Sequence, residues 1–357
     1  MEKPIFKITI ETDKFTEAAS TAFDYTFTGE SIFEGHIKPD IPEQFGIGLI
    51  VGPSGSGKSL LLKQFGQEDN PEWLPTKAIV SHFETPDDAV NKLMAVGLNS
   101  IPSWCKPFHV LSNGEQFRAS LARKLHNDSV IDEFTSVVDR NVAKAACVAL
   151  RRYVDNNKLS GIVLASCHSD ILEWLRPDWY FDTTNGMLHD GRLLRRPKIE
   201  LRIYPCKRST WGMFAKHHYL SSNLNKSCRA YLCTAVFGNS TDEVVVGFAS
   251  TISFPHAKFK NGYRGHRTVI LPDFQGLGIG PRLSNMIAEL HLQQGKRYFS
   301  RTAHPRFIAY RDNSPVWKRL SKNTKVKASK GTAKKSWNIN EDRVCCTHEY
   351  IGKGSNV

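Results

Sequence analysis

One segment of the sequence, Gly52-Pro53-Ser54-Gly55-Ser56-Gly57-Lys58-Ser59, combines residue types and spacing that suit phosphate binding. The apolar run Ile47–Val51 precedes it and three leucines beginning at Leu60 follow it, so the segment joins a strand to a helix. Glycines let backbone amides approach a phosphate chain, and the positive end of the helix dipole attracts that chain. We therefore predict an ATP site from Gly52 to Leu60, in which Lys58 reaches the β- and γ-phosphates and Ser59 binds magnesium.

Three later segments carry groups that could act on a bound triphosphate. The first is Ser112-Asn113-Gly114-Glu115, which opens an expected helix. In the second, an apolar pair precedes Asp132 and Glu133, and Asp139 follows. The third is an apolar strand that ends at His168. One carboxylate can hold magnesium, the next can orient a water molecule, and a neutral histidine can donate to the developing charge.

In this order, the four segments resemble the ATPase module of the ABC superfamily. The resemblance implies that Ser112, Asn113, Gly114 and Glu115 form the signature loop and that Asp132 completes the ATP and magnesium sites. It further implies that Glu133 is the catalytic base, Asp139 the D-loop acid and His168 the switch histidine. Because such a signature loop faces the nucleotide of another copy, the resemblance implies a homodimer that closes over two ATP molecules.

The sequence departs from the ABC pattern in several places. The signature has Asn113 and Glu115 where the family usually has glycine and glutamine, and Phe134 replaces the usual proline. No glutamine follows the expected strand Ala78–Phe83, where His82 is the nearest substitute. Residues 84–110 leave little room for the subdomain that grips a transporter's membrane half. We therefore expect similarity to ABC proteins that act on nucleic acids or the translation machinery.

A second glycine loop occurs late in the chain. The apolar Val269-Ile270-Leu271 precedes Gln275-Gly276-Leu277-Gly278-Ile279-Gly280, and a helix is expected to follow. The loop resembles the coenzyme-binding motif of GNAT acetyltransferases, and residues 199–351 follow that family's order of elements. The resemblance implies that these nine residues and Asn313 bind acetyl-CoA, or another acyl-CoA, and that Tyr310 is a candidate acid. A core aromatic is an equal alternative for Tyr310. The base stays open among His217, His218, Glu243, His256 and His266.

These loops need two domains, and the length of 357 residues suits two. The predicted fold class is α/β: a P-loop ABC-type ATPase domain (1–196), then an α+β GNAT acyltransferase domain (197–357). In the first we expect strands over residues 5–10 and 23–27. In the second we expect helices over Thr210–Tyr219 and Gly280–Gln294 and strands over residues 199–204, 229–237, 243–253, 267–271, 299–303 and 344–350.

Charge divides sharply between the two halves. Residues 1–196 hold 21 Lys/Arg against 26 Asp/Glu, a balance of −5, whereas residues 197–357 hold 27 against 9, a balance of +18. A field of this sign attracts phosphate backbones, and the stretch Lys322–Lys335 adds to it. Nucleic acid is therefore the expected partner of residues 197–357, although a solvated basic surface is the alternative.

The sequence also argues against a membrane-spanning or secreted protein. No window approaches 18 uninterrupted apolar residues, and the first ten residues lack a signal-like apolar core, so we expect neither a membrane span nor a secretory signal. The eight cysteines lack zinc spacing, which suggests reduced thiols and a cytoplasmic location.

We therefore predict a bifunctional ATP hydrolase and N-acyltransferase that acts on nucleic acid or a nucleic-acid-associated substrate. One alternative keeps the transferase but gives it protein or aminoacyl-tRNA amines as acceptors. Another is an ATP-driven nucleic-acid clamp with a non-catalytic GNAT fold.

Overall fold

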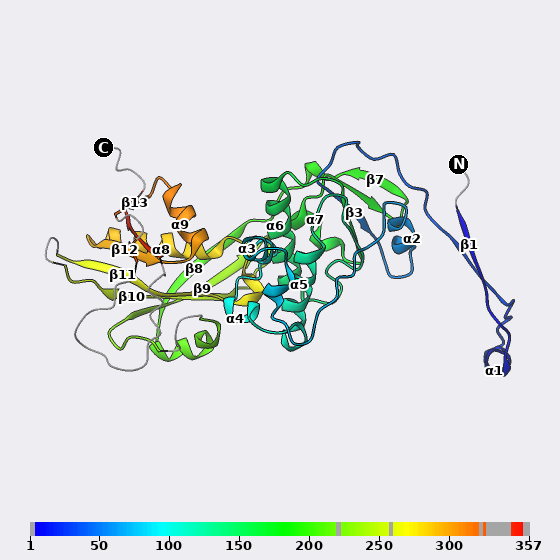
Figure 1. The fold of residues 1–357 in the computed structure, drawn as a ribbon, viewed down its shortest axis with the longest axis horizontal. Coiled ribbons are helices and arrows are strands. Elements are labelled where there is room, and N and C mark those ends of the chain that lie inside the picture. The colour runs from blue at the N-terminus through cyan, green and yellow to red at the C-terminus, as the bar shows by residue number, and fades with distance from the viewer. Residues whose placement is uncertain (1–3, 219–222, 257–259, 321–323, 326–343, 353–357) are drawn as a thin grey trace. The chain divides into compact units, whose positions relative to one another are not determined.

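The structure is a computed structural model that describes residues 4–218, 223–256, 260–320, 324–325 and 344–352 (Figure 1). It divides into two compact units. The N-terminal unit comprises Met1–Gly97 and Cys105–Arg196, and the C-terminal unit comprises Leu98–Trp104 and Pro197–Val357. Most of Lys322–Lys335 and residue 219 lie outside the described residues.

The N-terminal unit is built on a mostly parallel sheet with the order β4-β5-β3-β6-β7. Strand β3 (Ile47–Val51) pairs in parallel with β5 (Ile162–Ser166) and β6 (Trp179–Asp182), and β4 (Val130–Ile131) pairs in parallel with β5. Strand β7 (Met187–Asp190) is antiparallel to β6. Every residue of β3 and β5 is buried, which matches their apolar sequences and the rule that parallel sheets are covered on both faces.

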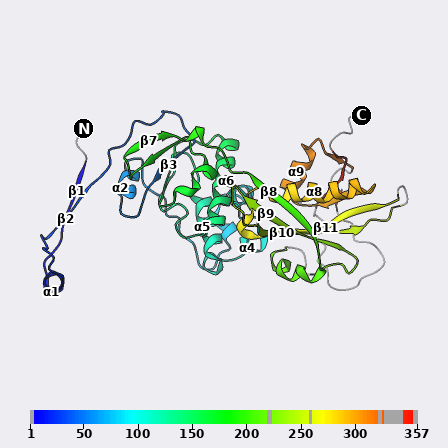
Figure 2. The same ribbon diagram turned by 180° about the vertical axis from the view of Figure 1, so that it is seen from behind.

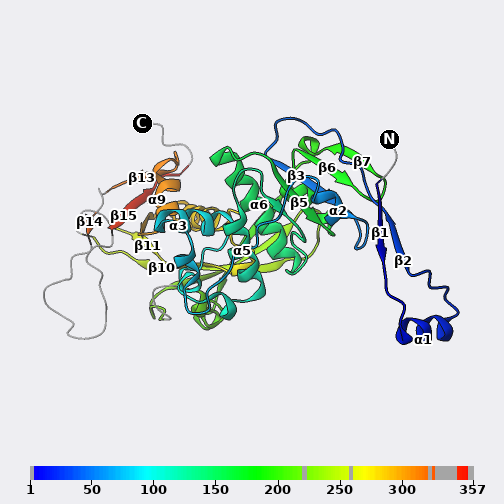
Figure 3. The ribbon, with the colours of Figure 1, turned by 45° about the vertical axis from the view of Figure 1, so that its right-hand side comes forward.

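Helices surround this sheet (Figure 3). Those that bear on the site are α2 (Lys58–Leu62), α5 (Asn113–Lys124) and α6 (Arg140–Asn157). The unit also contains α3 (Pro86–Ala95) and α7 (Leu172–Leu175). The apolar face of α6 is buried over nine residues, including Val142 and Leu150, so this long helix supplies much of the core.

A separate hairpin precedes the sheet. Strands β1 (Ile5–Thr9) and β2 (Glu30–Glu34) pair antiparallel and flank α1 (Lys14–Phe23). The expected strand over residues 23–27 is wrong, because Asp13 caps α1 by accepting the amides of Phe15 and Thr16. The helix then ends at Phe23, beside Asp24 in the left-handed conformation.

The expected strand Ala78–Phe83 is also wrong, since Ile79–His82 forms a 3₁₀-helix. The imidazole of His82 holds this turn: Nε2 accepts the amide of Leu74 at 3.0 Å, and Nδ1 donates to the carbonyl of Ala78 at 3.0 Å. His82 is thus engaged with its own loop.

The C-terminal unit contains an eight-stranded sheet within its described residues. The order is β13-β15-β12-β11-β10-β9-β8, and β14 pairs with β15. These strands are β8 (Ile199–Cys206), β9 (Arg229–Phe237), β10 (Val244–Ser253), β11 (Gly262–Ile270), β12 (Arg297–Thr302), β13 (Trp317–Arg319), β14 (Thr324–Lys325) and β15 (Val344–Tyr350). All neighbours are antiparallel except β11 and β12.

Helix α8 (Ile279–Gln293) connects β11 to β12 and packs against β8, β10, β11 and β12 (Figure 2). Helix α9 (Pro305–Asp312) follows β12, and α4 (Ile101–Trp104) belongs to the same unit. The expected helix Thr210–Tyr219 is instead two 3₁₀-helices, Arg208–Met213 and Ala215–His217.

Strands β11 and β12 pair over only three residues each, Gly262–Arg264 with Arg297–Phe299. Beyond this point β11 continues beside β10 alone, with His266 as an extra residue in its register. Because the parallel pairing stops early, the facing edges of β11 and β12 are unpaired beyond it. Residues of both strands line one cavity. Among the described residues, no helix has the length and apolar character that crossing a bilayer needs.

Candidate functional site

The first glycine loop joins β3 to α2, as the sequence predicts. Gly52, Gly55 and Gly57 have φ values of 151°, 77° and 86°, which side-chain-bearing residues rarely adopt. A Cβ atom at Gly52 would lie 1.8 Å from Oγ1 of Thr183. Glycine at position 52 is therefore required by both backbone conformation and space.

Polar contacts hold this loop in shape. The Thr183 hydroxyl donates to the carbonyl of Val51 at 3.1 Å and accepts from Oγ of Ser56 at 2.7 Å. His36 Nε2 donates to the carbonyl of Ser56 at 3.1 Å. The Lys58 ammonium donates to the carbonyl of Pro53 at 2.6 Å, so it lies across the loop itself.

A cavity of about 460 Å³ brings the loop and the acidic pair together. It is lined by Phe33, Ser54, Gly55, Gly57, Lys58, Ser59, Leu60, Asp132, Glu133, Ser136 and Cys167. Gly52, Pro53 and Ser56 shape the loop without lining the cavity. Sequence reasoning missed Phe33, because this residue comes from the separate hairpin and its ring lies beside Gly57 only in the folded chain.

Asp132 and Glu133 follow directly after β4. The amide of Glu133 donates to Oδ1 of Asp132 at 2.8 Å, and Glu133 has a φ of 47°. Phe134, where the ABC pattern has proline, is fully buried and donates its amide to the carbonyl of Ala165 at 2.7 Å. The buried ring thus anchors a turn in which Glu133 has the strained backbone often found at functional sites.

The signature residues form the start of α5. The amide and hydroxyl of Ser112 both donate to Oε2 of Glu115, each at 3.0 Å. Asn113 lines a second cavity, of about 440 Å³, that also includes Asp132 and Glu133. Gly114 is half-buried in the first turn of α5.

The two remaining candidates of this unit lie at element ends. Asp139 caps α6 by accepting the amides of Asn141 and Val142. His168 follows β5, and its amide donates to Oγ of Ser166 at 3.1 Å. Burial, reinforced by Arg140, lowers the pKa of His168, which favours the neutral imidazole. The cavity beside the P-loop is lined by Cys167, and His168 is not among its lining residues.

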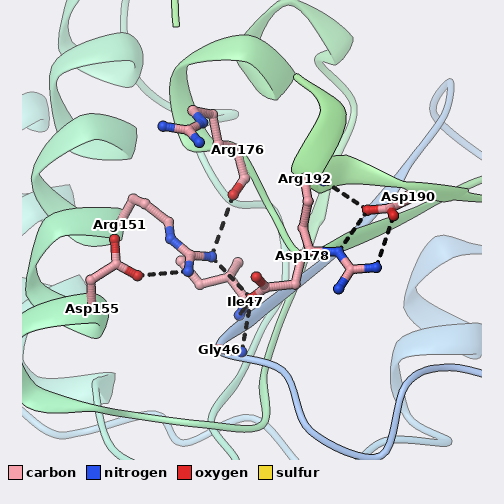
Figure 4. Close-up of polar contacts among 8 residues, drawn as sticks. All are labelled: Gly46, Ile47, Arg151, Asp155, Arg176, Asp178, Asp190 and Arg192. Carbon is pink, nitrogen blue, oxygen red and sulfur yellow. Dashed lines mark hydrogen bonds and ion pairs between the residues drawn. The ribbon is translucent and has the colours of Figure 1, made fainter. Parts of the chain in front are cut away.

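An ionic cluster fixes the start of β3 (Figure 4). One oxygen of Asp178, Oδ2, accepts the amides of Gly46 at 2.8 Å and Ile47 at 2.9 Å and Nη1 of Arg151 at 3.0 Å. Arg151 also pairs with Asp155 at 2.6 Å. Burial opposes ionisation of Asp178, but the Ile47 amide and Arg151 outweigh it and lower the pKa of this carboxyl.

The second glycine loop connects β11 to α8. Gly276 and Gly278 have φ values of 98° and 77°, and Gly278 is the N-cap of the 15-residue α8. Gln275 Nε2 donates to the carbonyl of Ile270 at 3.0 Å, and Oε1 accepts the amide of Asn99 at 3.2 Å. The loop therefore presents a helix N-terminus, as pyrophosphate binding requires. Nothing in the sequence predicted the contact between Gln275 and Asn99.

The other predicted coenzyme residues frame this loop. Val269, Ile270 and Leu271 close β11, and the amide of Leu271 donates to the carbonyl of Val246. Leu277 and Ile279 are buried, and a Cβ atom at Gly280 would lie 3.2 Å from the Phe307 ring. Asn313 is exposed just after α9.

Tyr310 faces α8. Its hydroxyl accepts Nδ2 of Asn285 at 2.8 Å, and Oδ1 of Asn285 accepts Nε1 of Trp317 at 2.8 Å. Tyr310 is not among the residues that line the cavity between β11 and β12. The neighbouring Arg311 and, one turn earlier, Phe307 do line it.

The cavity between β11 and β12, which we name the β11–β12 cleft, has a volume of about 460 Å³. Its lining includes no Asp or Glu. Its basic side chains are His218, Arg264, His266, Arg267, Arg301, His304 and Arg311. The cleft is therefore strongly cationic.

Among the candidates for the base, His218 and His266 lie at this cleft. Burial, followed by Arg267 and Arg264, lowers the pKa of His266 to about 4, and its Nε2 accepts the amide of Asn225 at 3.2 Å. Glu243 pairs instead with Arg202 at 2.8 Å and accepts from Thr234. His217, Glu243 and His256 do not line the cleft.

The sequence matches no protein-family model and no curated protein sequence. Parts of the chain are similar to solved structures. The ribosomal-protein-S18-alanine N-acetyltransferase from Escherichia coli is 11% identical over 44% of this chain and 99% of its own, with a TM-score of 0.31. A Bacillus subtilis acetyltransferase in complex with CoA is 9% identical over 43% and 99%, with a TM-score of 0.29. A bacterial ABC transporter cassette, solved as a dimer, is 14% identical over 43% and 87%, with a TM-score of 0.33.

These similarities concern the fold alone. The fold class follows from the strand order of each unit. The N-terminal unit is α/β with a P-loop between β3 and α2, as in an ABC-type ATPase. The C-terminal unit is α+β, with a glycine loop and α8 between the diverging β11 and β12, as in a GNAT acyltransferase. The fold class predicted from the sequence is confirmed.

Proposed function

We propose that the chain is a bifunctional enzyme, an ABC-type ATP hydrolase and an acetyl-CoA-dependent N-acyltransferase, that acts on nucleic acid. One observation carries the proposal: two glycine loops, each at the N-terminus of a helix, occur in separate units. The first shares a cavity with Asp132 and Glu133, and the second follows the strand that lines the cationic cleft.

In the N-terminal unit, Lys58 would bind the β- and γ-phosphates, and Glu133 would orient a water molecule. The water oxygen bonds to the γ-phosphorus while the bridge to the β-phosphate breaks, which yields ADP and inorganic phosphate. Magnesium, when bound, supplies charge that neutralises the phosphate oxygens. Ser59 and Asp132, which line the same cavity, fit its preference for oxygen ligands.

In the C-terminal unit, residues Val269–Leu271 and Gln275–Gly280, with Asn313, would bind acetyl-CoA. The acceptor nitrogen bonds to the thioester carbonyl carbon and the carbon–sulfur bond breaks, which yields an amide and CoA thiol. The amine proton passes through water to a histidine of the cleft, and an acid protonates the thiolate. Tyr310 is our candidate for that acid.

We further propose that the enzyme closes as an ATP-dependent homodimer, with Ser112–Glu115 of each copy against the nucleotide of the other. Asp139 and His168 would complete each site. All eight cysteines are free thiols, which suits the cytoplasmic location we propose.

The direct test is mass spectrometry of nucleosides and proteins after incubation with isotopically labelled acetyl-CoA, with and without ATP. We expect label on a nucleobase amine in the nucleic-acid fraction. Label found on protein or aminoacyl-tRNA amines alone would contradict the nucleic-acid acceptor but keep the transferase. No label in any fraction would contradict the transferase and favour a clamp.

A further inference from the structure

Arg311 is a buried cation whose charge no carboxylate balances. Its side chain is 4% exposed, and Nη2 donates to Oγ of Ser284 at 3.1 Å. Within the described part of the chain, Nε and Nη1 have no hydrogen-bond partner and no acidic group forms an ion pair with this guanidinium. Burial accordingly lowers the pKa of Arg311 to about 10. Such a group is costly to bury unless something satisfies it.

Aromatic rings satisfy it only in part. The guanidinium lies 4.7 Å from the ring centroid of Trp317 and 5.1 Å from that of Phe307. Cation–π contacts of this kind stabilise the charge but accept no hydrogen bonds in the plane of the guanidinium. Arg311 lines the β11–β12 cleft, so a ligand there can reach it.

Two further arginines of the cleft also lack carboxylate partners among the described residues. They are Arg264 on β11 and Arg301 on β12, and neither guanidinium forms a hydrogen bond or ion pair there. Burial, followed by repulsion from Arg301, lowers the pKa of Arg264. Three uncompensated guanidinium groups, from β11, β12 and α9, therefore converge on one cavity.

Three arginines elsewhere in the same unit have carboxylate partners. Arg202 pairs with Glu243 at 2.8 Å, Arg297 with Glu349 at 2.6 Å and Arg319 with Asp312 at 2.9 Å. Other arginines of the unit, such as Arg229 and Arg282, also lack a carboxylate partner among the described residues, but the cleft brings three such side chains into one cavity.

We propose that the β11–β12 cleft binds a phosphate group of the acyl acceptor, with Arg264, Arg301 and Arg311 as its ligands. Guanidinium groups match phosphate oxygens in paired hydrogen bonds, and several of them together need more negative charge than one carboxylate carries. The cleft therefore selects a nucleotide, either free or within a strand. This inference names the acceptor's chemistry and rests on the proposed acyltransferase function.

Isothermal titration calorimetry of the 357-residue chain tests the proposal. The nucleotide site of the N-terminal unit is first filled with a non-hydrolysable ATP analogue. Three probes follow: thymidine 5′-monophosphate, a 5′-phosphorylated tetrathymidylate, and thymidine, which lacks phosphate. The variants are Arg264→Gln, Arg301→Gln and Arg311→Met. The matched control, Arg202→Gln, removes one arginine that is paired and lies outside the cleft.

We expect the phosphorylated probes to bind and thymidine not to bind. Each cleft variant should weaken phosphate binding by about 10- to 100-fold, the usual effect of losing a hydrogen bond to a charged group. Arg202→Gln should bind as the unmodified chain does. Binding of both phosphorylated probes supports a free nucleotide as a sufficient source, and binding of the tetranucleotide alone supports a strand.

Two results would overturn the inference. One is equal binding of thymidine and its monophosphate together with no tetranucleotide binding. Because both side chains are partly exposed, Arg264→Gln and Arg301→Gln should fold, and the other result is unchanged phosphate affinity in both variants. Acetyl-CoA titration separates this outcome from failure of the proposed function. A chain that binds phosphate through these arginines but no acetyl-CoA keeps the inference about the cleft and loses the transferase.

Discussion

Asp178 offers a graded test of how the chain positions its P-loop. Three donors converge on Oδ2: the amides of Gly46 and Ile47, which begin β3, and the guanidinium of Arg151 (Figure 4). Asp178→Asn keeps an oxygen acceptor but removes the charge, whereas Asp178→Ala removes all three hydrogen bonds. The two variants therefore separate the contribution of charge from that of hydrogen bonding.

The magnitudes follow from these three bonds. A hydrogen bond to a charged group contributes about 1.5–3 kcal/mol and a neutral one about 0.5–1.5 kcal/mol. Partial exposure of Asp178, 21%, favours the lower values. We expect Asp178→Asn to lower the free energy of unfolding of the N-terminal unit by about 2 kcal/mol and Asp178→Ala by about 4 kcal/mol.

The assay is urea unfolding followed by hydrogen exchange of peptides that contain β3, which reports on this unit alone. Since the folded pKa of Asp178 is lowered, its stabilisation is present above the unfolded value of about 3.9 and is lost as the pH falls through the folded pKa. The difference between the unmodified chain and Asp178→Asn should be constant from pH 6 to 8 and shrink below about pH 4.

Asp190→Asn is the control, because Asp190 is an exposed carboxylate that accepts three hydrogen bonds, all from Arg192. It should leave the unfolding of β3 unchanged. Equal destabilisation by Asp178→Asn and Asp178→Ala, or a difference between the unmodified chain and Asp178→Asn that is undiminished at pH 3, would refute the reasoning.

Two further predictions concern the nucleotide site. Gly52→Ala should abolish ATP binding in a calorimetric titration, because its Cβ would overlap the Thr183 hydroxyl. A Cβ atom at Gly55 would lie in open space, so Gly55→Ala should bind ATP more tightly than Gly52→Ala. Equal ATP affinities of the two variants would contradict this steric argument. Glu133→Gln should slow ATP hydrolysis by about 10²–10⁴-fold while ATP still binds, with a dimer visible by size-exclusion chromatography in ATP and magnesium. Normal turnover in this variant would contradict the role of Glu133.

The fold near both glycine loops could be predicted because the information is local. A buried strand, a glycine loop and a helix follow one another within a few residues, and the left-handed φ values of Gly57 and Gly278 need glycine whatever the surroundings. The apolar sequences of β3 and β5 likewise specify strands buried on both faces.

Two expected strands are wrong because a local hydrogen bond outweighed the strand preference of a short segment. Residues 78–83 have the β-branched character of a strand, but His82 bonds to backbone groups on either side and closes a 3₁₀-turn. Near residue 23, the cap at Asp13 began a helix that ends at Phe23, where the expected strand was to begin. Neither contact is evident from propensity or periodicity.

The cleft could not be predicted from the sequence, because it depends on which faces meet. Tyr310 and Arg311 are adjacent, yet neighbours on a helix point about 100° apart. That rotation places Tyr310 against Asn285 and Arg311 in the cleft. The net charge of the second half indicated an anionic partner, but only the tertiary structure identifies the arginines that lack carboxylates.

The central claim, two independent phosphate-binding loops in one chain, is tested most directly by paired calorimetric titrations with ATP and acetyl-CoA. Lys58→Ala should lose ATP binding and keep acetyl-CoA binding, and Gly278→Trp should do the reverse. Gly295→Trp, at a φ of 70° with open space around it, controls for backbone strain and should bind both. Loss of both ligands in either loop variant, or an unmodified chain that binds no acetyl-CoA, would contradict the account.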